Sequence, residues 1–156
     1  MKVRRLGVAT VALTLLFLAG ASRANAPAGR YTMASGTVYD TKTKLTWQQT
    51  AAPGAGYTWG SAGASGTAQS YCATLSLNGP GWRLPTIKEL YTLVDFSQAQ
   101  GTALIDSTYF PGAPASTFWS ATPVSGSPGS AWDVNFFHGN ASNYGVSNAF
   151  DVRCVR

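Results

Sequence analysis

The sequence predicts one α+β domain, in which two short helices lie between an opening β-hairpin and a closing set of antiparallel strands. A helix-start motif at Thr86 and Glu89 places one helix in the middle of the chain. Alternation of apolar and polar residues over 131–136 predicts a strand near the end. Two cysteines, far apart in the sequence, predict one disulfide that ties the middle of the chain to its tail.

The first 26 residues have the organisation of a secretory signal peptide. Lys2, Arg4 and Arg5 form a basic beginning, residues 8–19 form an apolar run, and cleavage is expected after Ala26. The apolar run is about a dozen residues long, whereas a membrane-spanning helix needs ~20. We therefore expect a secreted or periplasmic protein with no integral membrane segment after cleavage.

Removal of this segment leaves a nearly neutral chain. The full sequence has 11 basic and 6 acidic side chains, but four of the basic ones lie within residues 1–26. The mature protein therefore carries seven basic and six acidic side chains, a net charge of +1. Binding to nucleic acid requires several clustered cations, so this composition argues against a nucleic-acid partner.

Cys72 and Cys154 are the only cysteines, and both follow the predicted cleavage site. In the oxidising compartment that an exported protein enters, an even number of cysteines is most simply explained by a disulfide. Closing a loop of 82 residues would stabilise the fold by about 4.5 kcal/mol in the chain-entropy model. The alternatives are two free thiols or a metal pair, although a zinc site would need four ligands.

The mature chain is predicted to begin with a flexible lead-in over residues 27–35, and the domain itself to span 36–156. Residues 37–39 and 45–49 have the composition of strands, and the polar stretch between them predicts a hairpin turn. Residues 50–66 are rich in glycine, alanine and serine, which predicts a surface loop. The two aromatic residues of this loop are expected to fold back onto the core.

Two amphipathic helices are predicted after the loop. The first covers about 66–77, where apolar residues at i, i+3, i+4 and i+7 turn Cys72 inward, and it ends at the Asn-Gly-Pro-Gly of 78–81. The second begins at Thr86 and continues to about Phe96. Its buried stripe is expected to contain Ile87, Leu90, Tyr91 and Val94.

Four residues around the start of the second helix form a structural motif. Thr86 is the expected N-cap, and Glu89 is its partner in a capping box. Arg83 alternates with apolar neighbours, so it can pair with Glu89 or with a carboxylate of the closing strands. Trp82 is expected in the core, with its indole N–H on a hydrogen-bond acceptor.

An irregular stretch and three strands complete the chain. Residues 97–115 predict a long irregular segment. Its expected core anchors are Leu104, Ile105, Tyr109 and Phe110. Strands are predicted at 117–122, 131–136 and 150–155, and the last is reached through a polar segment at 138–148.

Candidates for catalysis and metal binding are few. His138 is the only histidine, and Asp133 and Asp151 are the carboxylates that could orient it. No serine lies in a strand-turn-helix elbow, and a lone loop histidine explains the residue equally well. Calcium needs six to eight oxygen ligands, but the six carboxylates are spread over the whole mature chain. We therefore expect no catalytic site, no metal and no cofactor.

The best candidate for a ligand surface is the long-loop side of the domain, built from residues 97–115 and 123–145. Its amides, imidazole and phenol ring offer the directed hydrogen bonds and the apolar ring contact that neutral sugars require. The candidate residues are Asn135, His138, Asn140, Asn143 and Tyr144. An ordinary polar loop would explain the same composition.

Several short motifs, taken in order, resemble one known family. They lie at 37–40, 45–48, 71–72, 82–86, 89–90, 118–120, 131–132 and 152–156, and the one at 82–86 reads Trp-Arg-Leu-Pro-Thr. This set resembles the Lcl C-terminal domain family over residues 36–156. The resemblance implies a C-type-lectin-like fold with long loops, export from a bacterium and, in some members, adhesion to sulfated polysaccharides.

This chain departs from that picture in three ways. It lacks the collagen-like repeats of the namesake, a strong basic patch, and the Glu-Pro-Asn or Gln-Pro-Asp triplet of calcium-dependent lectins. The leading hypothesis is therefore an exported bacterial binding or adhesion module without catalytic activity, whose partner is a glycan or a cell-surface protein. The alternatives are a small secreted hydrolase that uses His138 and a structural component of the bacterial envelope.

Overall fold

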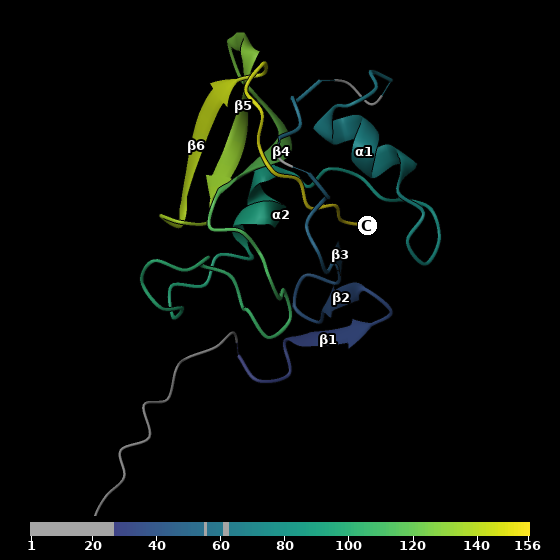
Figure 1. The fold of residues 1–156 in the computed structure, drawn as a ribbon, viewed down its shortest axis with the longest axis vertical. Helices are drawn as coiled ribbons and strands as arrows, with labels where there is room; N and C mark the ends of the chain where they lie inside the picture. Colours follow the sequence, from purple (N-terminus) through teal and green to yellow (C-terminus); the bar gives the residue numbers. More distant parts are fainter. Residues whose placement is uncertain (1–26, 55, 61–62) are drawn as a thin grey trace, which may run out of the picture.

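Two small antiparallel sheets and two short helices make up the computed structural model, which describes residues 27–54, 56–60 and 63–156 (Figure 1). The elements are β1 (Tyr31–Ala34), β2 (Thr37–Asp40), β3 (Thr46–Gln48), α1 (Ala68–Thr74), α2 (Ile87–Tyr91), β4 (Thr117–Val124), β5 (Ser127–Asn135) and β6 (Asn140–Gly145). The α+β class agrees with the prediction. The predicted signal peptide lies outside the described residues.

The first sheet contains β1, β2 and β3 in that order. The predicted hairpin is confirmed, because β2 pairs antiparallel with β3 and places Val38 opposite Trp47. The structure differs from the predicted lead-in over 27–35, whose second half forms β1. Tyr31 explains this difference, since its ring is only 4% exposed and packs at 5.5 Å against the ring of Phe110.

The second sheet contains β4, β5 and β6 in that order. β4 and β5 confirm two of the predicted strands. The prediction of a polar loop over 138–148 is wrong, because β6 pairs with β5 in an unbroken register from Asn140 opposite Asn135 to Gly145 opposite Ser130. β6 is exposed along most of its length, so its sequence carries no apolar alternation by which a strand could be recognised.

Both helices begin with a capping box. In α1 the Thr67 hydroxyl accepts from the Ser70 N–H, and the Ser70 hydroxyl accepts from the Thr67 N–H. In α2 the predicted pair is confirmed, because Thr86 and Glu89 satisfy each other's backbone N–H groups in the same way. These caps fix where each short helix starts.

α2 ends five residues earlier than the predicted end at Phe96. After Tyr91 the next backbone N–H groups bond to carbonyls three residues back, which tightens the chain beyond an α-helix. Because the chain tightens here, the residues that are buried differ from the predicted stripe. Tyr91 is 43% exposed, and Leu93, which lay outside the predicted stripe, is 2% exposed in the core.

The last residues run between the two sheets and do not form the predicted third strand of the closing sheet. They make isolated antiparallel or parallel bridges to four separate segments of the chain. The paired residues are Phe150 with Tyr57, Asp151 with Phe118, and Val155 with both Trp47 and Arg83. Residues 152–155 are buried as a result. We call residues 150–156 the C-terminal segment.

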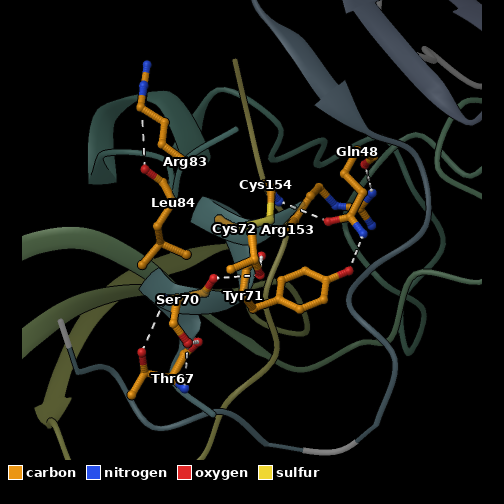
Figure 2. Close-up of a disulfide and its surroundings, with 10 residues drawn as sticks. Gln48, Thr67, Ser70, Tyr71, Cys72, Arg83, Leu84, Arg153 and Cys154 are labelled. Carbon is orange, nitrogen blue, oxygen red and sulfur yellow. Dashed lines mark hydrogen bonds between the residues drawn. A yellow bond between two sulfur atoms is a disulfide. The ribbon is translucent and has the colours of Figure 1, made fainter. Parts of the chain in front are cut away.

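The predicted disulfide joins Cys72 of α1 to Cys154 of the C-terminal segment (Figure 2). Gln48 at the end of β3 lies beside it. Its side-chain oxygen accepts from the Cys154 N–H at 3.2 Å, and its amide nitrogen donates to the Tyr71 hydroxyl at 2.8 Å. The disulfide and this amide therefore fasten α1, β3 and the C-terminal segment to one another.

The second sheet separates two clusters of buried side chains. Phe118 and Val134 are register partners and pack with Leu90 of α2 in one cluster. Trp119 and Ala131 belong to the other cluster, which contains the disulfide. Both faces of β4 and β5 are thus covered, and β6 is left at the outer edge of the sheet (Figure 1).

Candidate binding surface

Two exposed aromatic side chains contact Gly139, in the turn between β5 and β6, and a third belongs to that turn. The Tyr91 hydroxyl donates to the Gly139 carbonyl at 3.3 Å. The Phe96 ring lies against the glycine so closely that a β-carbon there would be 2.4 Å from a ring carbon. Phe137 belongs to the same turn. Tyr91, Phe96 and Phe137 are 43%, 67% and 47% exposed, and we call them the aromatic cluster.

A shallow hollow of about 410 Å³ lies next to this cluster, between α2 and the first residues of β6. Ile87, Lys88 and Tyr91 line it from the helix, and Asn140 and Ala141 line it from the strand. We call it the α2–β6 hollow. Lys88 is its only charged residue, so the hollow combines apolar walls with a single positive charge.

The local motif that was predicted at residues 82–89 holds α2 in place. Trp82 is 4% exposed, and its indole N–H donates to the Leu77 carbonyl at 2.8 Å. Arg83 pairs with Glu89 through two hydrogen bonds of 2.7 and 2.8 Å. This pairing, with help from the Thr86 backbone, lowers the pKa of the Glu89 carboxyl to about 2.

Asn135 holds the turn together, and both ends of its side-chain amide are engaged in hydrogen bonds within the chain. Its side-chain oxygen accepts from the backbone N–H groups of Phe137 and His138, at 2.9 and 3.0 Å. Its amide nitrogen donates to the Thr117 hydroxyl at 3.1 Å. This residue therefore positions the exposed side chains of the turn.

The other four candidate residues are exposed but do not share one hollow. His138 lies in the turn, where its ring contacts Phe137 at 4.8 Å. Asn140 lines the α2–β6 hollow. The register places Asn143 and Tyr144 on opposite faces of β6, and the Tyr144 ring packs edge-on against Phe150 at 5.2 Å. Their roles in binding stay predictions.

The carboxylates that could serve a hydrolytic histidine have other surroundings. Asp133 is completely buried, and burial raises the pKa of its carboxyl to about 6. Asp151 accepts a short hydrogen bond from the Ser116 hydroxyl. Among the residues that the structure describes, the His138 ring has no hydrogen bond to either carboxylate. Within the described ranges, His138 is thus not arranged with Asp133 or Asp151 as in a catalytic triad.

A second, smaller hollow of about 200 Å³ lies in the irregular segment 97–115. Ile105 and Phe110, which were predicted core anchors, form its apolar side, while Gln98, Thr102 and Ser107 supply polar groups. Leu104 joins this segment to the β5–β6 hairpin, because its N–H donates to the Phe136 carbonyl at 2.7 Å. Of the predicted long-loop side, residues 97–115 are irregular and contact the end of β5, whereas residues 123–145 form mostly β5 and β6.

Metal binding and membrane insertion are two further properties of the described residues. No three histidine, cysteine or acidic side chains within these ranges lie close enough together to bind a metal ion. No helix in the described part of the chain has the length and the apolar character to cross a membrane.

A comparison with protein-family models matches residues 36–156 to the Lcl C-terminal domain. The chain belongs to the Lcl C-terminal domain family. Membership in this family indicates a bacterial extracellular domain, and the disulfide fits an exported protein. Comparisons with curated proteins and with solved structures gave no match.

The aromatic cluster of this Lcl C-terminal domain was not found from the sequence. Tyr91 fits a buried helical stripe, Phe96 fits the end of the same helix, and Phe137 stands beside a polar segment. Only the tertiary structure brings them together, through Gly139, across a sequence distance of more than forty residues. The sole local signal is the Phe-His-Gly-Asn turn itself.

Proposed function

We propose that this protein is an exported bacterial binding or adhesion module without catalytic activity. It contacts a surface glycan or a surface protein through the face formed by α2 and the β5–β6 hairpin. The observation that carries this proposal is the aromatic cluster around Gly139. Exposed aromatic side chains that gather at one place are typical of recognition surfaces.

The chemistry of this face supports recognition of another molecule. Aromatic side chains offer rigid apolar area, and Tyr91 also presents a hydroxyl. His138 and Asn140, both exposed, add an imidazole and an amide at the rim. These groups suit either the apolar face and hydroxyls of a sugar or the mixed surface of a protein.

We also propose that the domain has a C-type-lectin-like fold. Two short helices, antiparallel strands, a long irregular segment and one disulfide support this assignment. A further feature in its favour is the pairing of β3 near the start of the domain with the end of the chain. The Thr46 N–H donates to the Arg156 carbonyl at 2.8 Å, and the Arg156 N–H donates back at 2.9 Å.

The binding proposal is tested with a glycan array and with pull-down from an envelope extract, both at micromolar protein. The expected result is a partner whose binding falls at least tenfold in Tyr91→Ala and in Phe137→Ala. Tyr39→Ala is the matched control, because Tyr39 is a 38% exposed tyrosine on β2, in the first sheet and away from the β5–β6 hairpin. Two blank screens, or equal loss in all three variants, would count against the proposal.

A further inference from the structure

β6 is the open edge of the second sheet. The opposite edge, at β4, is covered by the C-terminal segment, where the Trp119 N–H donates to the Asp151 carbonyl and the Asp151 N–H donates to the Thr117 carbonyl. The backbone of residues 140–144 has no hydrogen bond outside the β5–β6 pair anywhere in the described chain. Its outward N–H and C=O groups are therefore available to another extended chain.

β6 also lacks the features that normally protect such an edge. Natural sheets block exposed edges with charged side chains, proline, bulges or a covering segment. β4 shows two of these devices, since its register shifts near Pro123 and the C-terminal segment lies against it. The sequence of β6, Asn-Ala-Ser-Asn-Tyr-Gly, contains neither charge nor proline, and its register with β5 is regular.

The open edge and the α2–β6 hollow are parts of one groove. Asn140 and Ala141 belong to both, and Tyr91 stands at the opposite wall. A strand added beside β6 would direct alternate side chains, about 7 Å apart, toward the α2 face of the sheet. One of these side chains would enter the hollow beside Ile87 and Tyr91, where apolar groups are preferred.

We propose that this groove binds an extended polypeptide segment of a partner protein, which pairs with β6 as a fourth strand. The segment inserts an apolar side chain into the α2–β6 hollow and presents a carboxylate to Lys88. The inference rests on the proposed function, because it names the partner for the same face of the molecule. This mode of recognition draws affinity from the main chain and specificity from the hollow.

The same observations disfavour the other occupants. A glycan has no regular series of N–H and C=O groups to match a strand edge, although it could use the exposed amides. A second copy paired through β6 would bring no carboxylate to Lys88, because β6 contains no acidic residue. Lys88 has no ion-pair partner among the described residues, and the neighbouring Glu89 is already paired with Arg83.

The test uses random heptapeptides displayed on phage, panned against the exported, disulfide-bonded protein. The enriched peptides are expected to alternate apolar and polar residues and to contain an acidic one. Lys88→Glu should weaken their binding about tenfold, and Tyr91→Ala should weaken it at least as much. Lys42→Glu, at an exposed lysine in the β2–β3 turn, is the matched control and should bind like the unmodified protein.

Backbone methylation separates strand pairing from side-chain contact. In a strand added to an edge, alternate N–H groups point toward that edge. N-methylation of one alternating set of peptide amides should therefore abolish binding, while methylation of the other set should leave it nearly unchanged. Equal effects of the two sets, or the same affinity for Lys88→Glu as for Lys42→Glu, would overturn the inference.

The remaining outcomes distinguish this inference from the proposed function. A glycan that binds in a Tyr91-dependent manner, with no enriched peptide, overturns strand addition and leaves the binding module intact. Self-association through β6 in sedimentation experiments also overturns it, because the groove is then filled by a second copy. Blank results with peptides, with the glycan array and in the envelope pull-down remove the inference and the proposed function together.

Discussion

The C-terminal segment, which lies against the β4 edge of the second sheet, and β6, which forms the other edge, are both short extended stretches, but their surroundings are opposite. The C-terminal segment makes bridges to four other parts of the chain, and residues 152–155 are buried. In the described part of the chain β6 pairs with β5 alone, and four of its six residues are exposed. The chain thus uses one extended stretch to hold the domain together and leaves the other at the surface.

The difference follows from the side chains of the two stretches. The C-terminal segment contributes two valines and a cysteine to the core. β6 contributes small polar residues and Tyr144, which cannot bury enough apolar area to anchor a strand on both sides. Stability is therefore expected to depend strongly on the C-terminal segment and weakly on β6. Binding is expected to depend strongly on β6 and weakly on the C-terminal segment.

The largest expected effect comes from removing the disulfide. The Cys72→Ser, Cys154→Ser double variant opens a loop of 82 residues and should lose about 4.5 kcal/mol of unfolding free energy, as the chain-entropy model gives. Denaturant unfolding of the variant and of the oxidised protein measures this loss. Asn143→Ala, on exposed β6, should change the same quantity by less than about 0.5 kcal/mol. Comparable losses in both variants would abolish the contrast between the two stretches.

The second expected effect is a pH dependence of stability that arises on β5, the strand between the protected β4 and the exposed β6. Asp133 on β5 is completely buried, and neither carboxylate oxygen has a hydrogen bond within the described chain. Burial alone raises the pKa of its carboxyl from 3.8 to about 6, and no charged neighbour contributes to the shift. The folded state therefore binds this proton more tightly than the unfolded state does.

The unfolding free energy is therefore expected to fall as the pH rises. The stabilisation from the protonated Asp133 is complete below about pH 4 and is lost as the pH rises through 6, a change on the order of 3 kcal/mol. Asp133→Asn should flatten urea-unfolding stability between pH 4.5 and 7.5 and raise it at pH 7.5. Asp106→Asn is the control, because Asp106 is also buried but accepts the Thr108 N–H at 2.9 Å. An unchanged slope in Asp133→Asn would mean that this carboxyl is solvated.

The third effect concerns the turn that carries the aromatic cluster. Gly139 has a φ of 71°, and a β-carbon there would collide with the Phe96 ring. Gly139→Ala should lower the unfolding free energy by about 2 kcal/mol through backbone strain and displacement of the ring. Gly126→Ala, in the β4–β5 turn, has a φ of 76° but open space, so it should show only the strain, about 1 kcal/mol.

A double variant separates the two terms at Gly139. In the Phe96→Ala background the collision with the ring is gone and only the contact with Leu104 Cδ1 at 3.0 Å remains, so Gly139→Ala should cost little more than Gly126→Ala does. Chemical denaturation of the four proteins of this cycle measures the coupling. No coupling between positions 96 and 139 would show that the ring does not rest on the turn, and the aromatic cluster would lose its centre.

The sequence predicted the parts of the fold that are coded locally. The capping box of Thr86 and Glu89 and the β2–β3 hairpin depend on neighbouring residues, and both are present. The pairing of Cys72 with Cys154 could be predicted because no other cysteine competes. β6 could not be predicted, since its pairing with β5 leaves no apolar pattern in its own sequence.

The candidate surface was predicted only in outline. Most of residues 123–145, which were predicted as loop, form β5 and β6. Asn135 accepts backbone hydrogen bonds that no composition rule reveals. Tyr91 was assigned to the core because its spacing matches a helical stripe. The tight turn after α2 rotates the stripe, and this depends on tertiary packing of Leu93 rather than on local propensity.

The smallest expected effect compares the two helix caps. Thr67→Ala and Thr86→Ala each remove an N-cap and should each cost about 1 kcal/mol of unfolding free energy. Of the two helices, α2 lines the α2–β6 hollow and α1 does not. Thr86→Ala should therefore also weaken peptide or glycan binding several-fold, while Thr67→Ala should leave binding unchanged. Thermal unfolding and binding titrations on the same samples measure both quantities. Equal binding losses in the two variants would place the contact surface near α1 and the disulfide, and would reverse the division of roles between the C-terminal segment and β6.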